Sequence, residues 1–335
     1  MKCMKGVLKS RYPLVALIVL NWNSEKIIKD CLDSLLKTKY PNFKVVVVDN
    51  ASTDKSIEII KKHFRRKVDL IINKENLGFP KGMNAGIRYV LKKYKPKYVG
   101  LLNNDLLFPD KFWLLKIVKA MEKDKRIGVA SPIFIFPDGR IQKVGEKFGN
   151  NLASIMIKVL TTLPEREYTR KPTGIKEVNV FPGASPIIRR EVLEKVGLLD
   201  ERYSPFLVED VEYSFRIKKY GYRSVTVCDA KVIHLLSYST RRLSEEDVKK
   251  DLFKVYVVTR NAFLFSLEYF GFLKSFLISL PIIAFASFFT RRRKERGLSI
   301  SNLELRKNLK DRFYYLFKSI NDALKLRALK PKNYL

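Results

Sequence analysis

Cysteine is the first residue type that the sequence almost lacks. Cys3, Cys31 and Cys228 are odd in number, lie far apart and form no CxxC pair. Disulfide frameworks and structural zinc sites need more cysteines at closer spacing. We therefore expect neither feature, and the composition fits a reducing cytoplasm.

Glycine-rich phosphate loops are also missing. The first apolar run, residues 13–20, is followed by NWNSEK, so the GxGxxG fingerprint of dinucleotide-binding folds is absent there, and the chain has no Walker loop. The charge of a bound phosphate must then be met in another way. A divalent cation held by a carboxylate is the natural substitute, because Mg²⁺ and Mn²⁺ bind carboxylate and phosphate oxygens together.

Acidic residues are scarce relative to basic ones. The 335 residues include 66 Lys and Arg against 34 Asp and Glu, which gives a net charge of +32. Such an excess suits phosphorylated substrates, acidic lipids or nucleic acid, although a solvated lysine-rich surface explains it equally well. No zinc finger, basic zipper or RNA-binding aromatic motif accompanies the charge. A nucleic-acid-binding protein is therefore the weaker alternative, and we expect no specific nucleic acid partner.

Apolar strands and amphipathic helices alternate along the first 124 residues. Basic residues precede the first apolar run, as in a signal peptide, but no small-residue cleavage site follows it, so a buried strand explains it better. Strands are predicted at residues 14–20, 43–50, 68–73 and 97–105, and helices at residues 24–36, around 57–60, 80–93 and 109–124. This order predicts an α/β fold, with a mostly parallel twisted sheet flanked by helices.

Polar side chains follow three of the predicted strands at the point where each strand ends. They are Asn21, Asp49, Asn103, Asn104 and Asp105. In an open α/β sheet, ligands bind beyond the carboxyl ends of the strands, so these side chains are expected to line one crevice. Each of them taken singly is explained as well by a capping or turn role.

Several stretches of the chain occur in an order typical of one enzyme family. They are VALIVLNWNSEKIIKDCLDSLL, VVVVDNASTDKS, NLGFPKGMNAGI, LLNNDLLFP, FPGASPIIRREVLEKVGLLDERY and FLVEDVEYSFRIKKYGYRSVTVCDAKVIHLLSYS. Together they cover roughly residues 13 to 265 and resemble family 2 glycosyltransferases, in particular the rhamnosyltransferase-like branch. The resemblance implies a GT-A fold and an inverting, metal-dependent transfer of a sugar from a nucleotide-diphosphate donor to an acceptor hydroxyl.

The resemblance also implies which residues bind the donor. Asp49 matches the residue that reads the donor base, and Asn21 lies in the loop around the nucleoside. The remaining positions match the loop that lines the nucleotide, and they are Asn76, Gly78 and Asn84.

The metal motif of the family is only partly kept. Asn103, Asn104 and Asp105 stand where the family has DxD, so Asp105 is the expected ligand of Mg²⁺ or Mn²⁺. His234 matches a further metal ligand, and a satisfied histidine at a strand end is the alternative. Because Asn103 replaces an acid, a catalytically inactive, membrane-bound partner protein of the same fold is the second interpretation.

Two adjacent acids begin the helix predicted in FLVEDVEYSFRIKKYG. Asp210 is the expected base for the acceptor hydroxyl and Glu209 the second candidate, although carboxylates at a helix N-terminus are also favoured by the helix dipole. Glu212 is expected to lie on the helix surface. FPGAS, residues 181–185, is expected beside the acceptor, where Gly183 allows close approach of the backbone.

The last third of the chain is both apolar and basic. Residues 275–290 carry no charge, yet these 16 residues fall short of the ~20 that a spanning helix needs, and RRRKER follows them. We expect a basic tail (1–12), a GT-A domain (13–240) and a helical extension (241–335) that lies on an anionic membrane surface at its cytoplasmic face. A helical packing domain and a single transmembrane helix are the alternatives. The acceptor is then expected to be a glycan or a lipid-linked precursor.

Overall fold

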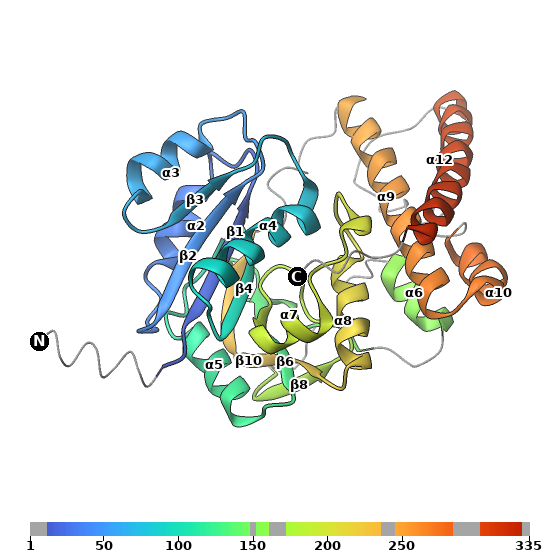
Figure 1. The fold of residues 1–335 in the computed structure, drawn as a ribbon. Helices are drawn as coiled ribbons and strands as arrows, with labels where there is room; N and C mark the ends of the chain where they lie inside the picture. The colour runs from blue at the N-terminus through green and yellow to red at the C-terminus, as the bar shows by residue number, and fades with distance from the viewer. Residues whose placement is uncertain (1–11, 148–151, 161–171, 236–244, 284–301, 330–335) are drawn as a thin grey trace, which may run out of the picture.

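The structure is a computed structural model that describes residues 12–147, 152–160, 172–235, 245–283 and 302–329. A sheet of ten strands forms its centre, in the order β3-β2-β1-β4-β9-β6-β10-β5, with β7 paired to β6 and β8 paired to β10. The helices of the C-terminal region stand beside this sheet domain, on the right of Figure 1. Residues 1–11 of the predicted basic tail and the RRRKER cluster lie outside the described residues.

The first half of the chain confirms the predicted α/β alternation. Four neighbouring strands pair in parallel, and they are β1 (Val15–Asn21), β2 (Phe43–Asp49), β3 (Asp69–Ile72) and β4 (Tyr98–Asn103). The helices between and after them are α2 (Ile28–Leu35), α3 (Ser56–Phe64), α4 (Gly78–Lys93) and α5 (Trp113–Lys123). In the β1–β2 register Asn21 lies opposite Asp49, and in the β1–β4 register Leu20 lies opposite Asn103. The polar strand ends therefore meet at one edge of the sheet.

The second half of the sheet is mixed. The short strand β9 (Ile187–Arg189) runs antiparallel between β4 and β6 (Ile127–Ile135), and β10 (Arg223–His234) runs parallel to β6. Three other short strands complete the sheet, and they are β5 (Leu106–Leu107), β7 (Ile141–Lys143) and β8 (Ile175–Val178). The connections carry helices α7 (Arg190–Val196), η1 (Glu201–Tyr203) and α8 (Glu209–Lys219).

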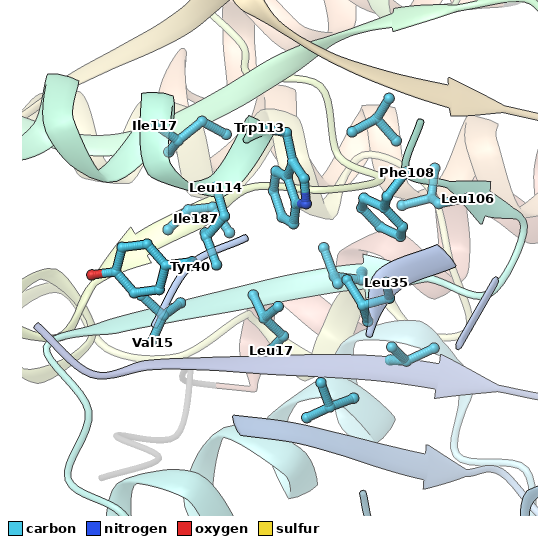
Figure 2. Packing of buried hydrophobic residues seen from close by; sticks show 14 of the residues in the cluster. Val15, Leu17, Leu35, Tyr40, Leu106, Phe108, Trp113, Leu114, Ile117 and Ile187 are labelled. Carbon is cyan, nitrogen blue, oxygen red and sulfur yellow. The ribbon is translucent and has the colours of Figure 1, made fainter. Parts of the chain in front are cut away.

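Alternate residues of the central strands supply two separate hydrophobic cores. Val15, Leu17 and Val19 of β1 pack with α2, α3 and α5 on one face, and Ala16 and Ile18 pack with α4, α7 and α8 on the other. This is the pattern expected of a strand that is buried on both sides. Figure 2 shows the first core, in which the rings of Phe108 and Trp113 lie 5.0 Å apart.

The C-terminal helices share a third core with the segment around η1 and the start of α8. The long helices α9 (Glu245–Tyr269) and α12 (Asn302–Ala328) lie side by side, with α6 (Leu152–Leu160), α10 (Phe272–Lys274) and the π-helical turn η3 (Ser275–Ser279) beside them. Tyr203 and Val208, which flank the turn before α8, are buried in this cluster together with residues of α9. In the ranges that the structure describes, no helix is both long and apolar enough to cross a membrane. The predicted boundary at residue 240 lies outside the described residues.

Trp113 tests the first core. Its side chain is fully buried and its indole N–H donates to Thr38 Oγ1 at 3.0 Å, so Trp113→Ala is expected to lower the free energy of unfolding by about 3–5 kcal/mol. Trp22, which is 53% exposed, is the matched control, and Trp22→Ala is expected to change it by about 0.5 kcal/mol or less. Chemical denaturation measures both. Equal losses in the two variants would show that Trp113 does not anchor the core.

Candidate active site

The loop after β2 is organised around Asp49. This carboxylate is fully buried and accepts hydrogen bonds from Asn21 Nδ2 at 2.7 Å, from the Ser52 amide at 2.8 Å and from Ser52 Oγ at 2.7 Å. Asn104 Nδ2 reaches Asn21 Oδ1 at 3.5 Å and joins the end of β4 to this loop. Asn21 and Asp49 therefore hold the sheet edge together, and their contacts with a donor nucleoside stay predictions.

The loop before α4 also has its polar groups engaged. Asn76 Oδ1 accepts from the Gly78 amide at 2.9 Å, and Gly78 has a φ of +74°, where a Cβ atom would lie 2.7 Å from Pro205 Cα. Asn84 is fully buried. Its Nδ2 donates to the Leu199 carbonyl at 2.8 Å, and its Oδ1 accepts from the Leu199 backbone N–H at 3.1 Å. Asn84 thus links α4 to the segment around Leu199 by two hydrogen bonds. Its role in lining the nucleotide stays a prediction.

Short-strand pairing brings His234 to Asp105. The first residue of β5, Leu106, is paired with His234, and the Leu235 amide donates to the Asp105 carbonyl at 3.0 Å. His234 Nε2 then lies 3.4 Å from Asp105 Oδ1, with both side chains largely buried. Two residues that are far apart in the sequence, and that were predicted as metal ligands, therefore lie side by side.

Gln142 of β7 fixes the orientation of His234. Its Oε1 lies 2.9 Å from His234 Nδ1, and its Nε2 donates to the His234 carbonyl at 2.9 Å. When Nδ1–H donates to this oxygen, the lone pair of Nε2 faces Asp105, which is the tautomer that a metal ligand needs. The sequence contains no motif that would have identified Gln142, because its role depends on a pairing across 92 residues.

The spacing of Asp105 Oδ1 and His234 Nε2 is compatible with a single cation held by two protein groups. Mg²⁺ binds oxygen at about 2.0–2.1 Å in octahedral geometry, so neighbouring ligand atoms lie about 3 Å apart, close to the 3.4 Å between Nε2 and Oδ1. In the part of the chain that the structure describes, no group of three or more His, Cys, Asp and Glu side chains is arranged to hold a metal ion. Substrate phosphate and water would have to fill the other positions, as they commonly do for Mg²⁺.

The acidic pair lies against the FPGAS loop. A Cβ atom added to Gly183 would be only 2.8 Å from Asp210 Oδ2, so a larger residue here would displace the Asp210 carboxylate. The carbonyl of the next residue, Ala184, accepts a hydrogen bond from the Asn103 backbone N–H at 2.9 Å. The loop therefore connects Asp210 of α8 with the end of β4 and places both beside the same part of the sheet.

Both acids of the pair are harder to ionise than ordinary carboxyls. Burial raises the pKa of Glu209, and the neighbouring Asp210 charge raises it further. Burial also raises the pKa of Asp210, although the Lys143 ammonium opposes this shift. Glu209 Oε2 is buried and has no hydrogen-bond partner among the described residues. Because the raised pKa of Glu209 favours its protonated form, Asp210 is the member of the pair better suited to accept a proton, as a general base must.

The prediction that Glu212 lies on the helix surface is wrong. Glu212 is buried, forms an ion pair with Arg216 at 2.9 Å and accepts from the Tyr269 hydroxyl at 3.0 Å. Arg216 also donates to the carbonyls of Val196 and Leu198. The helix period gave no sign of this burial, because the face that carries Glu212 is covered by α9, which lies far along the chain.

The family model described as "Glycosyl transferase family 2" matches residues 16–197. The chain belongs to glycosyl transferase family 2. Its sheet with flanking helices is the GT-A fold of that family, as the resemblance predicted. The match ends before α8, so the acidic pair and His234 lie beyond it.

Curated relatives of this family 2 chain include proteins named for O-antigen and rhamnose transfer. It is 28% identical over 239 residues to the O-antigen biosynthesis protein RfbC of Myxococcus xanthus, covering 68% of this chain and 18% of RfbC. It is 25% identical to the dTDP-rhamnosyl transferase RfbF of Shigella flexneri, covering 74% of this chain and 78% of RfbF. The chain spans between 18% and 35% of the length of three of its relatives, RfbC among them.

Solved structures share the fold at low identity. The mannosyltransferase PcManGT of Pyrobaculum calidifontis, in complex with GDP-Man and Mn²⁺, matches with a TM-score of 0.53 and 17% identity, over 96% of this chain and 88% of that chain. TarS 1-349 of S. aureus, in complex with UDP-GlcNAc, matches with a TM-score of 0.52 and 19% identity, over 94% and 90%. These structures show that the chain shares its fold with solved glycosyltransferases.

Glu209 provides a pH test that does not depend on turnover. Because its pKa is raised in the folded state, the folded chain binds more protons than the unfolded chain between the two pKa values, and stability falls as the pH rises through the folded pKa. Glu209→Gln removes this penalty, so its melting temperature is expected to exceed that of the wild type by several degrees at pH 9 and by nothing measurable near pH 4.

The control for this test is Glu58→Gln, which changes an exposed glutamate of α3. Its melting temperature is expected to follow the wild type at each pH. A constant offset between Glu209→Gln and the wild type at pH 4 and pH 9 would contradict the burial of an ionisable carboxyl at position 209.

Proposed function

We propose that this family 2 chain transfers a sugar from a nucleoside-diphosphate donor to an acceptor hydroxyl and inverts the anomeric centre. The observation that carries the proposal is the convergence of two acidic centres around the FPGAS loop and the end of β4. One centre is Asp105 with His234, and the other is Asp210, whose carboxylate lies against Gly183. Family membership and the names of the relatives support the same reaction.

The first centre is suited to the donor diphosphate. Asp105 Oδ1 and His234 Nε2 would hold a Mg²⁺ or Mn²⁺ ion, with Gln142 fixing the imidazole. When bound, the cation supplies Lewis-acid stabilisation of the negative charge on the departing diphosphate. Asn103 is a neutral amide where the family has an acid, so the site carries less negative charge against the donor. The Mn²⁺ in the complex of PcManGT is consistent with this use of the fold.

The second centre acts on the acceptor. Asp210 takes the proton of the acceptor hydroxyl while the hydroxyl oxygen bonds to the anomeric carbon. The bond between that carbon and the diphosphate oxygen breaks in the same step, and the nucleoside diphosphate leaves with its electron pair. A single displacement of this kind inverts the anomeric centre. Glu209, with its raised pKa, keeps the region from carrying two full charges.

An anionic membrane surface is the proposed location of the acceptor. Several large side chains of the C-terminal helices are exposed, and they are Phe272, Leu273, Leu277, Phe313, Tyr314 and Phe317. Leu273 and Leu277, four residues apart, are 69% and 67% exposed. Exposed apolar side chains on a chain with a net charge of +32 suit an acidic lipid surface. A relative named N-acetylglucosaminyl-diphospho-decaprenol L-rhamnosyltransferase, from Mycobacterium tuberculosis, supports a lipid-linked acceptor. The cytoplasmic face is the side of the membrane that we propose for this contact.

Turnover tests the two centres separately. A screen of nucleotide sugars with Mn²⁺ or Mg²⁺ is expected to yield at least one donor that releases nucleoside diphosphate. Asp210→Asn is expected to lower kcat by about 10²-fold or more and to keep metal-dependent nucleotide binding, because it removes only the base. Asp105→Ala is expected to lose both turnover and metal-dependent nucleotide binding. Calorimetry with Mn²⁺ and the nucleoside diphosphate measures the binding.

The pH profile adds a second criterion for the base. Because the pKa of Asp210 is raised, kcat/KM is expected to increase with pH and to reach half its plateau above the ~3.9 of an ordinary aspartate. Full activity of Asp210→Asn would exclude Asp210 as the base. Absence of turnover with every donor, in a chain that still binds nucleotide, would favour the inactive partner protein.

Vesicle binding tests the membrane surface. Co-sedimentation with phosphatidylglycerol vesicles is expected for the wild type, and Leu273→Ser with Leu277→Ser is expected to weaken it by about tenfold or more, since two leucines lose their burial in lipid. Phe112→Ser, which changes a 46% exposed residue of the sheet domain, is the control and is expected to bind as the wild type does. If the wild type does not co-sediment with anionic vesicles, the proposed membrane location of the acceptor is refuted.

A further inference from the structure

The backbone that leads into the acidic pair has an unfavourable conformation. Leu207 and Val208 have φ angles of +71° and +73°, in the left-handed region. Bulky and β-branched side chains rarely adopt such angles, and the conformation persists only where surrounding contacts impose it. Val208 is the N-cap of α8, and its carbonyl accepts the first helical bond, from the Glu212 amide at 2.9 Å. The turn therefore sets the direction in which Glu209 and Asp210 emerge.

A pair of residues from α9 holds this turn. Asn261 is fully buried, and its Nδ2 lies 2.9 Å from the Tyr203 carbonyl, 3.0 Å from the Phe206 carbonyl and 2.7 Å from the Leu207 carbonyl. Its two amide hydrogens are thus shared among three acceptors of one short loop. Without such a donor these three carbonyls, of which that of Tyr203 is buried, would lose their partners, which is costly away from water.

Arg260 completes the arrangement from the other side. Its Nε and Nη2 donate to Asn261 Oδ1 at 2.9 and 2.7 Å, which orients the amide so that its nitrogen faces the loop. Arg260 Nη2 also donates to the Ser204 carbonyl. The two side chains together therefore bind carbonyls along residues 203–207, immediately before the acids.

The far end of α9 is anchored to the same part of the molecule. Glu268 forms an ion pair with Arg202 at 2.6 Å, and the Tyr269 hydroxyl donates to Glu212 at 3.0 Å. The helix is thus fixed at Asn261 and at its C-terminal end, so the position of the Asn261 amide relative to the turn is determined by several contacts. None of the comparisons with known proteins assigns a role to Asn261, and the family model ends at residue 197.

We propose that Asn261, oriented by Arg260, is a positioning residue that holds the left-handed turn at Leu207 and Val208 and thereby keeps the Asp210 carboxylate against Gly183. The C-terminal extension is then part of the active site and not only a means of attachment. The catalytic part of this proposal rests on the proposed function, whereas the ordering of the turn does not. Displacement of a reacting group by about 1 Å can cost on the order of 10²-fold in rate.

Asn261→Asp and Asn261→Ala test the proposal. The aspartate keeps the shape of the side chain but has no N–H donor, so both variants are expected to release the turn. We expect kcat to fall by about 10- to 100-fold, with the KM for the donor changed less than about twofold. The midpoint of the acidic limb of the pH profile is expected to move to lower pH, because a displaced Asp210 is less buried.

Ser319→Ala is the matched control. Ser319 is a fully buried polar residue of α12 whose hydroxyl donates to the Tyr256 carbonyl of α9 at 3.1 Å, in the same helical core but away from the turn. This variant is expected to keep the kcat and the pH midpoint of the wild type. Equal effects of Asn261→Ala and Ser319→Ala would show that Asn261 only stabilises the helices, and would overturn the proposal.

Hydrogen exchange separates this proposal from the proposed function, because it needs no turnover. Faster amide exchange in the Asn261 variants is expected within residues 203–212 and not within the strands β1 and β2. Unchanged exchange in residues 203–212 would refute the proposal even in an active enzyme. If the wild type has no turnover with any donor, the proposed function fails by itself, and the exchange result still decides whether Asn261 orders the turn.

Discussion

The burial of two adjacent carboxyl groups is the constraint on which this end of the molecule depends. Taking such groups out of water is unfavourable, and the penalty grows when a second acid is next to the first. The N-terminus of α8 and the Lys143 ammonium stabilise the negative charge of Asp210, and the raised pKa of Glu209 favours its neutral form, so the penalty is smaller. The surrounding structure must then hold them in place, and the loop at Gly183, the turn before α8 and helix α9 do so.

The sheet supplies the opposite side of the site through ordinary strand geometry. Parallel strands deliver their carboxyl ends to one edge, so the end of β4 lies beside those of β1 and β2. The short antiparallel contact between β5 and β10 then folds the chain after Asp105 back onto His234. This two-residue strand places the Asp105 carboxylate beside the His234 imidazole, although the two residues come from different halves of the protein.

The sequence was sufficient to predict the parallel half of the sheet and the family, because long apolar runs and ordered motifs carry that information. Asp105 and His234, each expected to bind a metal from the resemblance, lie side by side, and their binding of a metal stays a prediction. The sequence was insufficient for β5, β7 and β9, which have two or three residues each and exist only through their partners. Buried Glu212 was misjudged because its cover comes from α9. The contacts of Gln142 with His234 and of Asn261 with the turn before α8 could not be predicted, because they join residues that are far apart in the sequence. The hydrogen bonds of Asp49 with Asn21 and of Asn84 with Leu199 could not be predicted from the sequence for the same reason.

The third hydrophobic core has a consequence for attempts to recombine relatives of this protein. Tyr203 and Val208 belong to the same packed unit as α9 and α12, although more than 30 residues of sequence lie between Val208 and α9. A chimera spliced at residue 240 would combine a foreign helix with a native loop and leave mismatched surfaces where the acids begin. Exchangeable modules in this fold are therefore discontinuous, and a functional graft has to carry residues 203–208 along with the C-terminal helices.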